Sequence, residues 1–184
     1  RRSLVLSNTR TESFEEILST TAWILNMGKA PGQILDFFGR APLPAHAADA
    51  LRVAPETEAI VTRRTRTADD APLLFESLYF HPSLTEALGP VDPARDSIHR
   101  HLVAHGINCN NLSRCLNVRA ATEQESSALD IAAGTPVMQT EMRVYDYAGE
   151  PVEFAVQIHR ADTLTIGLNN VRGHASPLWF EIDS

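Results

Sequence analysis

Two stretches of the chain read as pairs of β-strands joined by tight turns, and this pattern limits the fold more than any other feature. The first pair spans residues 61–80 and turns at Asp69-Asp70. The second pair joins 137–147 to 152–160 across Ala148-Gly149-Glu150-Pro151. Turn-forming residues between runs of β-branched and aromatic residues are typical of antiparallel hairpins. The two hairpins therefore predict an antiparallel sheet at the centre of the fold.

The other expected elements are separate helices and strands without the regular βαβ alternation of a parallel sheet. Ser19, Thr20 and Thr21 open an expected helix over 19–27, which stops at Gly28. Further helices are expected at 44–51, at 96–104 and from Thr122, and further strands at 33–39, 108–120 and 178–182, with a short strand at 4–6 and a helical piece at 14–18. The predicted class is α+β: a mostly antiparallel sheet with helices packed between and against the strands.

The size and charge of the chain restrict its function. With 184 residues, of which 43% are hydrophobic, the chain is expected to form one domain with a sizeable core. Its 23 Asp and Glu residues outnumber its 16 Lys and Arg residues, so it lacks the positive charge that drives non-specific nucleic-acid binding. No apolar run is long enough to cross a bilayer or to form a secretory signal. We therefore predict a cytoplasmic protein without membrane association.

The sequence contains no signature of metal binding or nucleophilic catalysis. His99, His101 and His105 fall on one expected helix, but the acid of a zinc-protease helix is missing there. Cys109 and Cys115 share a strand face at a separation too large for a disulfide, so both are expected to be reduced. A Gly-rich phosphate loop and a Gly-x-Ser-x-Gly elbow are also absent. We predict no metal and no cofactor.

Arg64 and Arg66 are the most informative charged residues. Because side chains alternate across a strand, both guanidinium groups share one face, and Arg63 lies on the other. Two neighbouring cations repel each other unless an anion lies between or opposite them. That anion is either a structural carboxylate, such as Glu76 on the returning strand, or a ligand. The spacing alone leaves both interpretations open.

Four motifs follow one another in a specific order along the chain. They are Ala47-Ala48-Asp49-Ala50-Leu51-Arg52-Val53; Arg64-Thr65-Arg66-Thr67-Ala68-Asp69-Asp70-Ala71-Pro72 with Glu76 and Tyr79; Ser97-Ile98-His99-Arg100-His101-Leu102 ahead of Gly106-Ile107; and Gly149-Glu150-Pro151-Val152-Glu153 leading into His159-Arg160-Ala161-Asp162. In this order, from Ser19 to Leu168, the chain resembles the UTRA domain, which is the effector-binding half of the HutC branch of GntR-type bacterial repressors.

This resemblance implies a chorismate-lyase-like α+β fold, a homodimer, and an amino-terminal winged-helix domain that contacts operator DNA. The chain starts at Arg1-Arg2 without an initiator Met, which fits the absence of that winged-helix domain from this chain. We accordingly expect residues 1–18 to be a linker or a residual amino-terminal segment. Residues 19–184 are expected to form the effector-binding domain.

The resemblance also implies a ligand pocket. The positions that match the family pocket are Arg64, Arg66, Glu76, Ser97 and Glu153. The charges of Arg64 and Arg66 agree with a role in such a pocket, because arginine side chains bind phosphate-like oxygens in a bidentate manner.

Three matching positions depart from the family pattern. Members of the family usually carry Phe followed by Ser or Thr at the first helix start, eight residues before a Gly; here these positions hold Thr20 and Thr21. Ser13 matches by type but lies further upstream, and Thr21 is the preferred hydroxyl. His99 and His159 stand where the family usually has tyrosines.

With these departures, the chain resembles the subgroup that controls phosphonate-uptake and phosphonate-degradation operons, which has a similar Ser-Leu-His helix start, here Ser97-Ile98-His99, and an Arg-Ala-Asp after the second hairpin, here Arg160-Ala161-Asp162. A small anionic effector, with a phosphonate or phosphate ester favoured, is therefore expected, while a sugar phosphate or a carboxylate stays an alternative. Two further alternatives are an enzyme of the chorismate-lyase type and a dimerisation module that has lost its ligand. A shared fold does not transfer function, so the regulator is preferred to the enzyme.

Overall fold

The computed structural model describes residues 17, 19–93, 95–168 and 178–182, and its main feature is a six-stranded antiparallel sheet. The strand order is β1-β2-β3-β6-β5-β4. The strands are β1 (Pro31–Pro42), β2 (Glu58–Ala68), β3 (Ala71–Phe80), β4 (Asn111–Ala120), β5 (Pro136–Tyr145) and β6 (Pro151–Arg160). Both predicted hairpins, β2–β3 and β5–β6, are present, and they pair with each other through β3 and β6. The predicted α+β class is confirmed.

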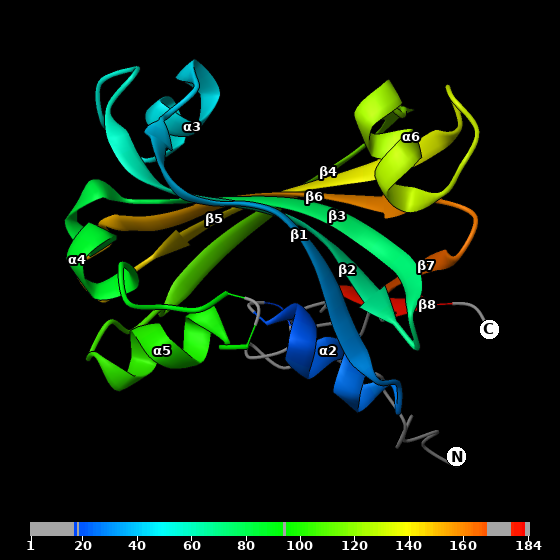
Figure 1. Ribbon diagram of the computed structural model, residues 1–184, viewed down its shortest axis with the longest axis horizontal. Helices are drawn as coiled ribbons and strands as arrows, with labels where there is room; N and C mark the ends of the chain where they lie inside the picture. The colour runs from blue at the N-terminus through cyan, green and yellow to red at the C-terminus, as the bar shows by residue number, and fades with distance from the viewer. Residues whose placement is uncertain (1–16, 18, 94, 169–177, 183–184) are drawn as a thin grey trace, which may run out of the picture.

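Short helices cover both faces of this sheet. They are α2 (Thr20–Asn26), α3 (Ala45–Ala50), the 3-10 turn η1 (Pro82–Leu84), α4 (Thr85–Leu88), α5 (Ile98–Ala104) and α6 (Glu123–Leu129). Helices α3 and α6 lie over one face, whereas α2 and α5 lie over the other, which we call the α2–α5 face (Figure 1). The predicted arrangement of helices against the strands is therefore confirmed.

The helix starts follow from capping residues. The hydroxyl of Ser19 accepts a hydrogen bond from the Ala22 amide at 3.3 Å and begins α2. Ser97 does the same for the Arg100 amide at the start of α5, at 3.4 Å. A reciprocal pair of bonds between Thr122 and the residue three positions later begins α6. These local signals explain why the three helices were predictable.

Several details differ from the sequence-based expectation. The strands β1 and β4 span 31–42 and 111–120 instead of 33–39 and 108–120. The segment η1–α4 was not expected, and neither was β7 (Leu164–Leu168), which pairs with the predicted β8 (Leu178–Ile182). Gly167 in β7 lies directly against the Trp179 ring of β8, where a side chain would not fit. Glycine weakens the sequence pattern of a strand, but at this position the pairing of β7 with β8 requires it. The expected strand at 4–6, Ser13, and the expected helical piece at 14–18 apart from Ile17 lie outside the described residues.

The core consists of apolar clusters on both sides of the sheet. On the α2–α5 face, one cluster packs around Leu78, Phe80 and Leu102, and another around Trp23, Ile24 and Leu74. The opposite face holds separate clusters under α3 and α6. Between the two clusters of the α2–α5 face, the sheet instead carries buried polar side chains. That polar zone is the candidate site.

Both cysteines, Cys109 and Cys115, are free thiols, as predicted.

Candidate functional site

Two buried arginines on β2 form the centre of the polar zone. Arg64 and Arg66 are each only 5% exposed, and both project from the α2–α5 face of the sheet. Arg63, which directly precedes Arg64, is half-buried and approaches Asp36 on β1 instead, at 3.6 Å. The predicted division of the three arginines between the two faces is therefore present in the structure. Because Arg64 and Arg66 are buried, their charges require compensation within the fold.

Glu76 supplies part of that compensation. It lies directly opposite Arg64 in the β2–β3 register, and its Oε1 accepts a 2.6 Å hydrogen bond from Arg64 Nε. Arg64 Nη1 also donates to Oε1 of Gln33 on β1, at 2.8 Å. Burial by itself would raise the pKa of Glu76, but the charges of Arg64 and Arg66 and the hydrogen bonds to the carboxylate hold this pKa below its usual range. Glu76 is therefore a buried, ionised carboxylate.

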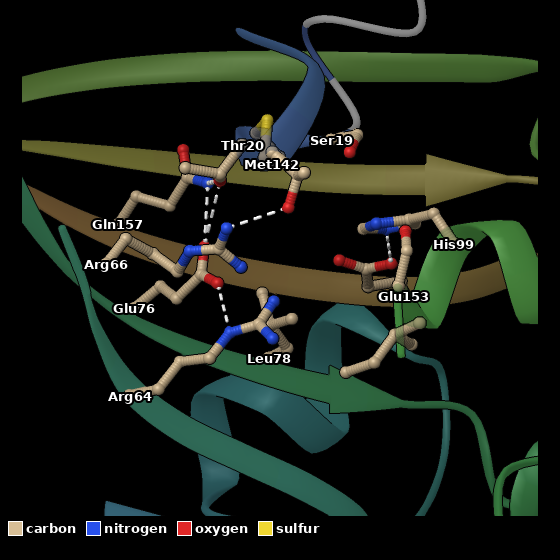
Figure 2. A pocket seen from close by; sticks show the side chains of 13 residues that line it. Ser19, Thr20, Arg64, Arg66, Glu76, Leu78, His99, Met142, Glu153 and Gln157 are labelled. Carbon is tan, nitrogen blue, oxygen red and sulfur yellow. Dashed lines mark hydrogen bonds and ion pairs between the residues drawn. The ribbon is translucent and has the colours of Figure 1, made fainter. Parts of the chain in front are cut away.

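The second oxygen of Glu76 joins β3 to α2 and β6. The Thr20 hydroxyl donates to Oε2 at 3.2 Å, and Gln157 Nε2 donates to the same oxygen at 3.2 Å. Gln157 is the register partner of Glu76 on β6, which places its amide beside the carboxylate. Figure 2 shows Arg64, Arg66, Glu76 and Gln157 gathered into one group of side chains.

Arg66 has less compensation than Arg64. Its Nη2 donates to the Thr21 hydroxyl at 2.7 Å. Its Nε is buried and has no hydrogen-bond partner among the described residues, and none of their carboxylates lies within ion-pair distance of Arg66. Burial lowers the pKa of Arg66; the charge of Glu76 opposes this effect, and the charge of Arg64 adds to it. Arg66 is thus a buried cation with one neutral hydroxyl as its direct partner.

A second pair lies at the other end of the zone. His99 on α5 and Glu153 on β6 approach to 2.7 Å between Nε2 and Oε2, and Figure 2 shows them apart from the arginines. Burial opposes protonation of His99, but the charge of Glu153 and the hydrogen bond to it raise the pKa of His99 above its ordinary value. The imidazole in this pair is therefore favoured in its charged form.

The structure brings eight of the nine predicted site residues to one small cavity. They are Thr20, Thr21, Arg64, Arg66, Glu76, Ser97, His99 and Glu153. The sequence analysis missed Ser19, Leu78, Ile98, Met142 and Gln157, which also line the cavity, and Gln33, which holds Arg64. The strand alternation that links Gln157 to Glu153 was a usable signal for Gln157. The cavity has a volume of about 10 Å³, which is room for a single water molecule.

His159 is the predicted site residue that lies elsewhere. It is 2% exposed and packs edge-on against Trp23 of α2 and Phe180 of β8, in a separate cavity of about 20 Å³. Its two ring nitrogens have no hydrogen-bond partner among the described residues. Burial lowers the pKa of His159 to about 4; the charge of Glu76 opposes this effect, and the charge of Arg114 adds to it. His159 is therefore a neutral core residue two positions beyond Gln157, and the matching position placed it wrongly in the arginine cavity.

The described part of the chain offers no cluster of three or more residues suited to a metal ion. None of its helices is long and apolar enough to span a membrane.

Comparisons with known proteins give one family and one fold. The family model of the UTRA domain matches residues 26–165. The effector domain of PhnF from Mycobacterium smegmatis superposes with a TM-score of 0.72 at 19% identity, over 78% of this chain and 89% of that chain. A PhnF C-terminal domain superposes with a TM-score of 0.64 at 25% identity, over 75% and 87% of the two chains.

The ligand-binding domain of a protein classed as a GntR-family transcriptional regulator, from Bordetella bronchiseptica, has a TM-score of 0.64 at 16% identity, over 72% of this chain and 84% of that chain. No protein among the curated sequences matches the chain.

Proposed function

The chain belongs to the UTRA domain family, and on this basis we propose that it is the ligand-sensing and dimerisation domain of a GntR-type transcription regulator of the HutC branch. Its effector is a small anionic metabolite that binds at Arg64 and Arg66. A phosphonate or a phosphate ester is the favoured chemistry, because guanidinium groups bind tetrahedral anions through several charge-assisted hydrogen bonds.

One observation carries this proposal: two buried guanidinium groups share a single neighbouring carboxylate. Glu76 pairs directly with Arg64, while among the described residues the Thr21 hydroxyl is the one hydrogen-bond partner of the Arg66 side chain. A buried charge without an ionic partner is costly, so an anion that reaches Arg66 gains a strong interaction. Thr20 and Thr21 add hydroxyl groups beside the same position.

The cavity beside Arg66 also contains two carboxylates. Glu76 and Glu153 are both almost fully buried, and each already has a partner, Arg64 for Glu76 and His99 for Glu153. A ligand with hydrogen-bond donors next to its anionic group is complementary to such a site. This description fits a sugar phosphate as well as a phosphonate, and the binding experiment below distinguishes them.

We propose that the ligand acts by population shift. The site joins α2, the β2–β3 hairpin, β6 and α5, so a bound anion favours one relative position of these elements. In a homodimer, such a shift alters the distance between two DNA-binding heads and thereby operator affinity. We propose the winged-helix domain as the source of DNA binding and the cytoplasm as the location. Residues 19–184 are the proposed effector-binding domain, preceded by the linker 1–18.

The enzyme alternative is not supported. The family that the chain belongs to is that of the UTRA domain, and the resemblance to this family favours a regulator over an enzyme.

Calorimetry tests the proposal. We expect propylphosphonate to bind the parent chain, and Arg66→Ala to weaken binding by about 10-fold or more, the effect of losing one charge-assisted interaction. Arg63→Ala is the matched control, because Arg63 lies on the same strand but on the other face, and it should leave the affinity unchanged. Equal affinities of the parent and Arg66→Ala proteins would refute the site. Glucosamine 6-phosphate and citrate, titrated in parallel, distinguish a phosphonate sensor from a sugar-phosphate or carboxylate sensor.

A further inference from the structure

An open groove adjoins the buried cavity and has a different character. It has a volume of about 320 Å³ and shares Thr21, Arg66 and Ser97 with the cavity. A volume of this size is typical of small-molecule sites, whereas the buried cavity holds no more than a water molecule. Most of any bound metabolite must therefore lie in the groove, with Arg66 at the junction of the two spaces.

The groove is strongly positive in an otherwise acidic chain. Of the described residues, Arg66, Arg95, Arg100 and the acidic Asp96 are the charged residues that line it, so its formal charge is +3 − 1 = +2. The whole chain carries a net charge of −7. Such a local excess of positive charge attracts anions in spite of the overall charge.

The two outer arginines are available to a ligand. Among the described residues, Arg100 forms no ion pair, and its backbone amide is held by the Ser97 hydroxyl. Arg95 makes one loose contact, 3.7 Å from its Nε to Asp92, and its side chain is 86% exposed. The carboxylate of Asp96 accepts a hydrogen bond from the Asp92 amide at 3.0 Å, which ties it to its own loop.

Gln33 connects the wall of the groove to the buried arginines. Its amide nitrogen donates to the carbonyl oxygen of Pro93 in the loop that leads to Arg95, and its amide oxygen accepts from Arg64. One side chain of β1 thus fixes the loop relative to the cavity. The groove and the cavity therefore adjoin each other at Thr21, Arg66 and Ser97, and Arg95 and Arg100 line the groove beyond this junction.

We propose that this groove binds a second anionic group of the effector, so that the ligand is a molecule with two separated anionic groups. One group, a phosphonate or phosphate, lies at Arg66 and Arg64; the other, a carboxylate or a second phosphate, lies between Arg95 and Arg100. This inference rests on the proposed function and names the class of ligand more narrowly.

Two probes of equal carbon chain length test it: propylphosphonate, with one anionic group, and propane-1,3-diphosphonate, with two. Calorimetry at constant ionic strength should show that the parent protein binds the diphosphonate about 10-fold more tightly, which corresponds to one additional charge-assisted contact. The double variant Arg95→Ala, Arg100→Ala should lose this preference for the diphosphonate. It should retain its affinity for propylphosphonate within about 2-fold, because solvent-exposed charges that do not contact an anion directly attract it only weakly.

The other outcomes separate the two proposals. If the parent shows no preference for the diphosphonate, or the double variant keeps it, the second anion site is refuted while the binding of propylphosphonate still supports the first. If the parent binds neither probe, or Arg66→Ala binds propylphosphonate as tightly as the parent does, the proposed function fails and this inference fails with it. Arg63→Ala should behave as the parent with both probes.

Discussion

Arg64 and Glu76 face each other across the β2–β3 hairpin, and a 2.6 Å hydrogen bond joins Arg64 Nε to Glu76 Oε1. This pair answers half of the question that the sequence raises about the two arginines, since the structural carboxylate is present. The other half concerns Arg66, whose direct partner is a hydroxyl. One carboxylate between two buried cations leaves a site that is complementary to an anion.

Removal of the Glu76 charge should destabilise the fold and strengthen anion binding. In Glu76→Gln, two buried guanidinium groups lose their common carboxylate, and we expect the free energy of unfolding to fall by about 3 kcal/mol, as for other broken buried ion pairs. Urea denaturation measures this loss. Added propylphosphonate should restore more stability to the variant than to the parent.

The control is Asp162→Asn, which removes the charge of an exposed ion pair with Arg160 and should change stability by less than about 1 kcal/mol. Equal stability of the Glu76→Gln and parent proteins would show that the buried pair does not contribute.

The chain should be a homodimer in solution. The family's effector domains are expected to supply much of the pairing surface, and two-fold symmetry is the commonest arrangement of oligomers. Sedimentation equilibrium at tens of micromolar should give twice the chain mass of 20.2 kDa. A single species of 20.2 kDa under those conditions would contradict the prediction.

Affinity for a fixed monoanion should depend on pH through His99. Its pKa is raised by Glu153, so the imidazolium is fully present below the ordinary value near 6.5 and is lost as the pH rises through the raised pKa. Propanesulfonate keeps one charge over this range, and its affinity should fall by about 5-fold as His99 loses its proton, which corresponds to about 1 kcal/mol. Calorimetry from pH 6 to pH 9 measures this. His99→Gln should give a flat profile; the same slope in both proteins would exclude His99.

His159 should affect stability rather than binding. Its folded-state pKa of about 4 lies below the ordinary value, so its contribution to stability is complete above about pH 6.5 and is lost as the pH falls. From pH 7 to pH 5, the unfolded chain takes up the proton first, and this group alone should reduce the free energy of unfolding by about 2 kcal/mol.

Denaturation of the parent and of His159→Phe at both pH values isolates this effect. The variant should lose less stability on acidification than the parent by about that amount. An identical pH dependence would mean that the imidazole is not buried in its neutral form.

Much of the fold was predictable because its signals are local. Turn residues located both hairpins, and Ser19, Ser97 and Thr122 located three helix starts. The pairing of β3 with β6 brings the two hairpins together over a sequence separation that no local signal covers. The strand β7 was missed because Gly167 weakens its strand pattern. The glycine is needed there because the Trp179 ring of β8 packs against it, and this contact is with a distant part of the sequence.

The same distinction holds for the site. Alternation along β2 placed Arg64 and Arg66 on one face. Glu76 comes to lie opposite Arg64 through a register shift between Arg66 and Thr67, which the position of the turn alone does not predict. Gln157 and Gln33 lie on β6 and β1, outside the β2–β3 hairpin. Their contacts with the site could be predicted only from the order of the strands in the sheet. His159 shares a face with Gln157, but the ring of Phe180 from the distant β8 places it in the apolar core. A matching position in the sequence contains no information about that contact.

The most direct test of the anion site is an NMR titration that follows the Nε–H signals of Arg64 and Arg66 while propylphosphonate is added. Assignment by Arg64→Lys and Arg66→Lys identifies the two signals. If the anion binds these side chains, both signals should shift together and saturate at the affinity that calorimetry gives, while the Arg63 signal stays in place. Saturable binding that leaves the Arg64 and Arg66 signals unchanged would contradict the account and locate the anion elsewhere on the protein.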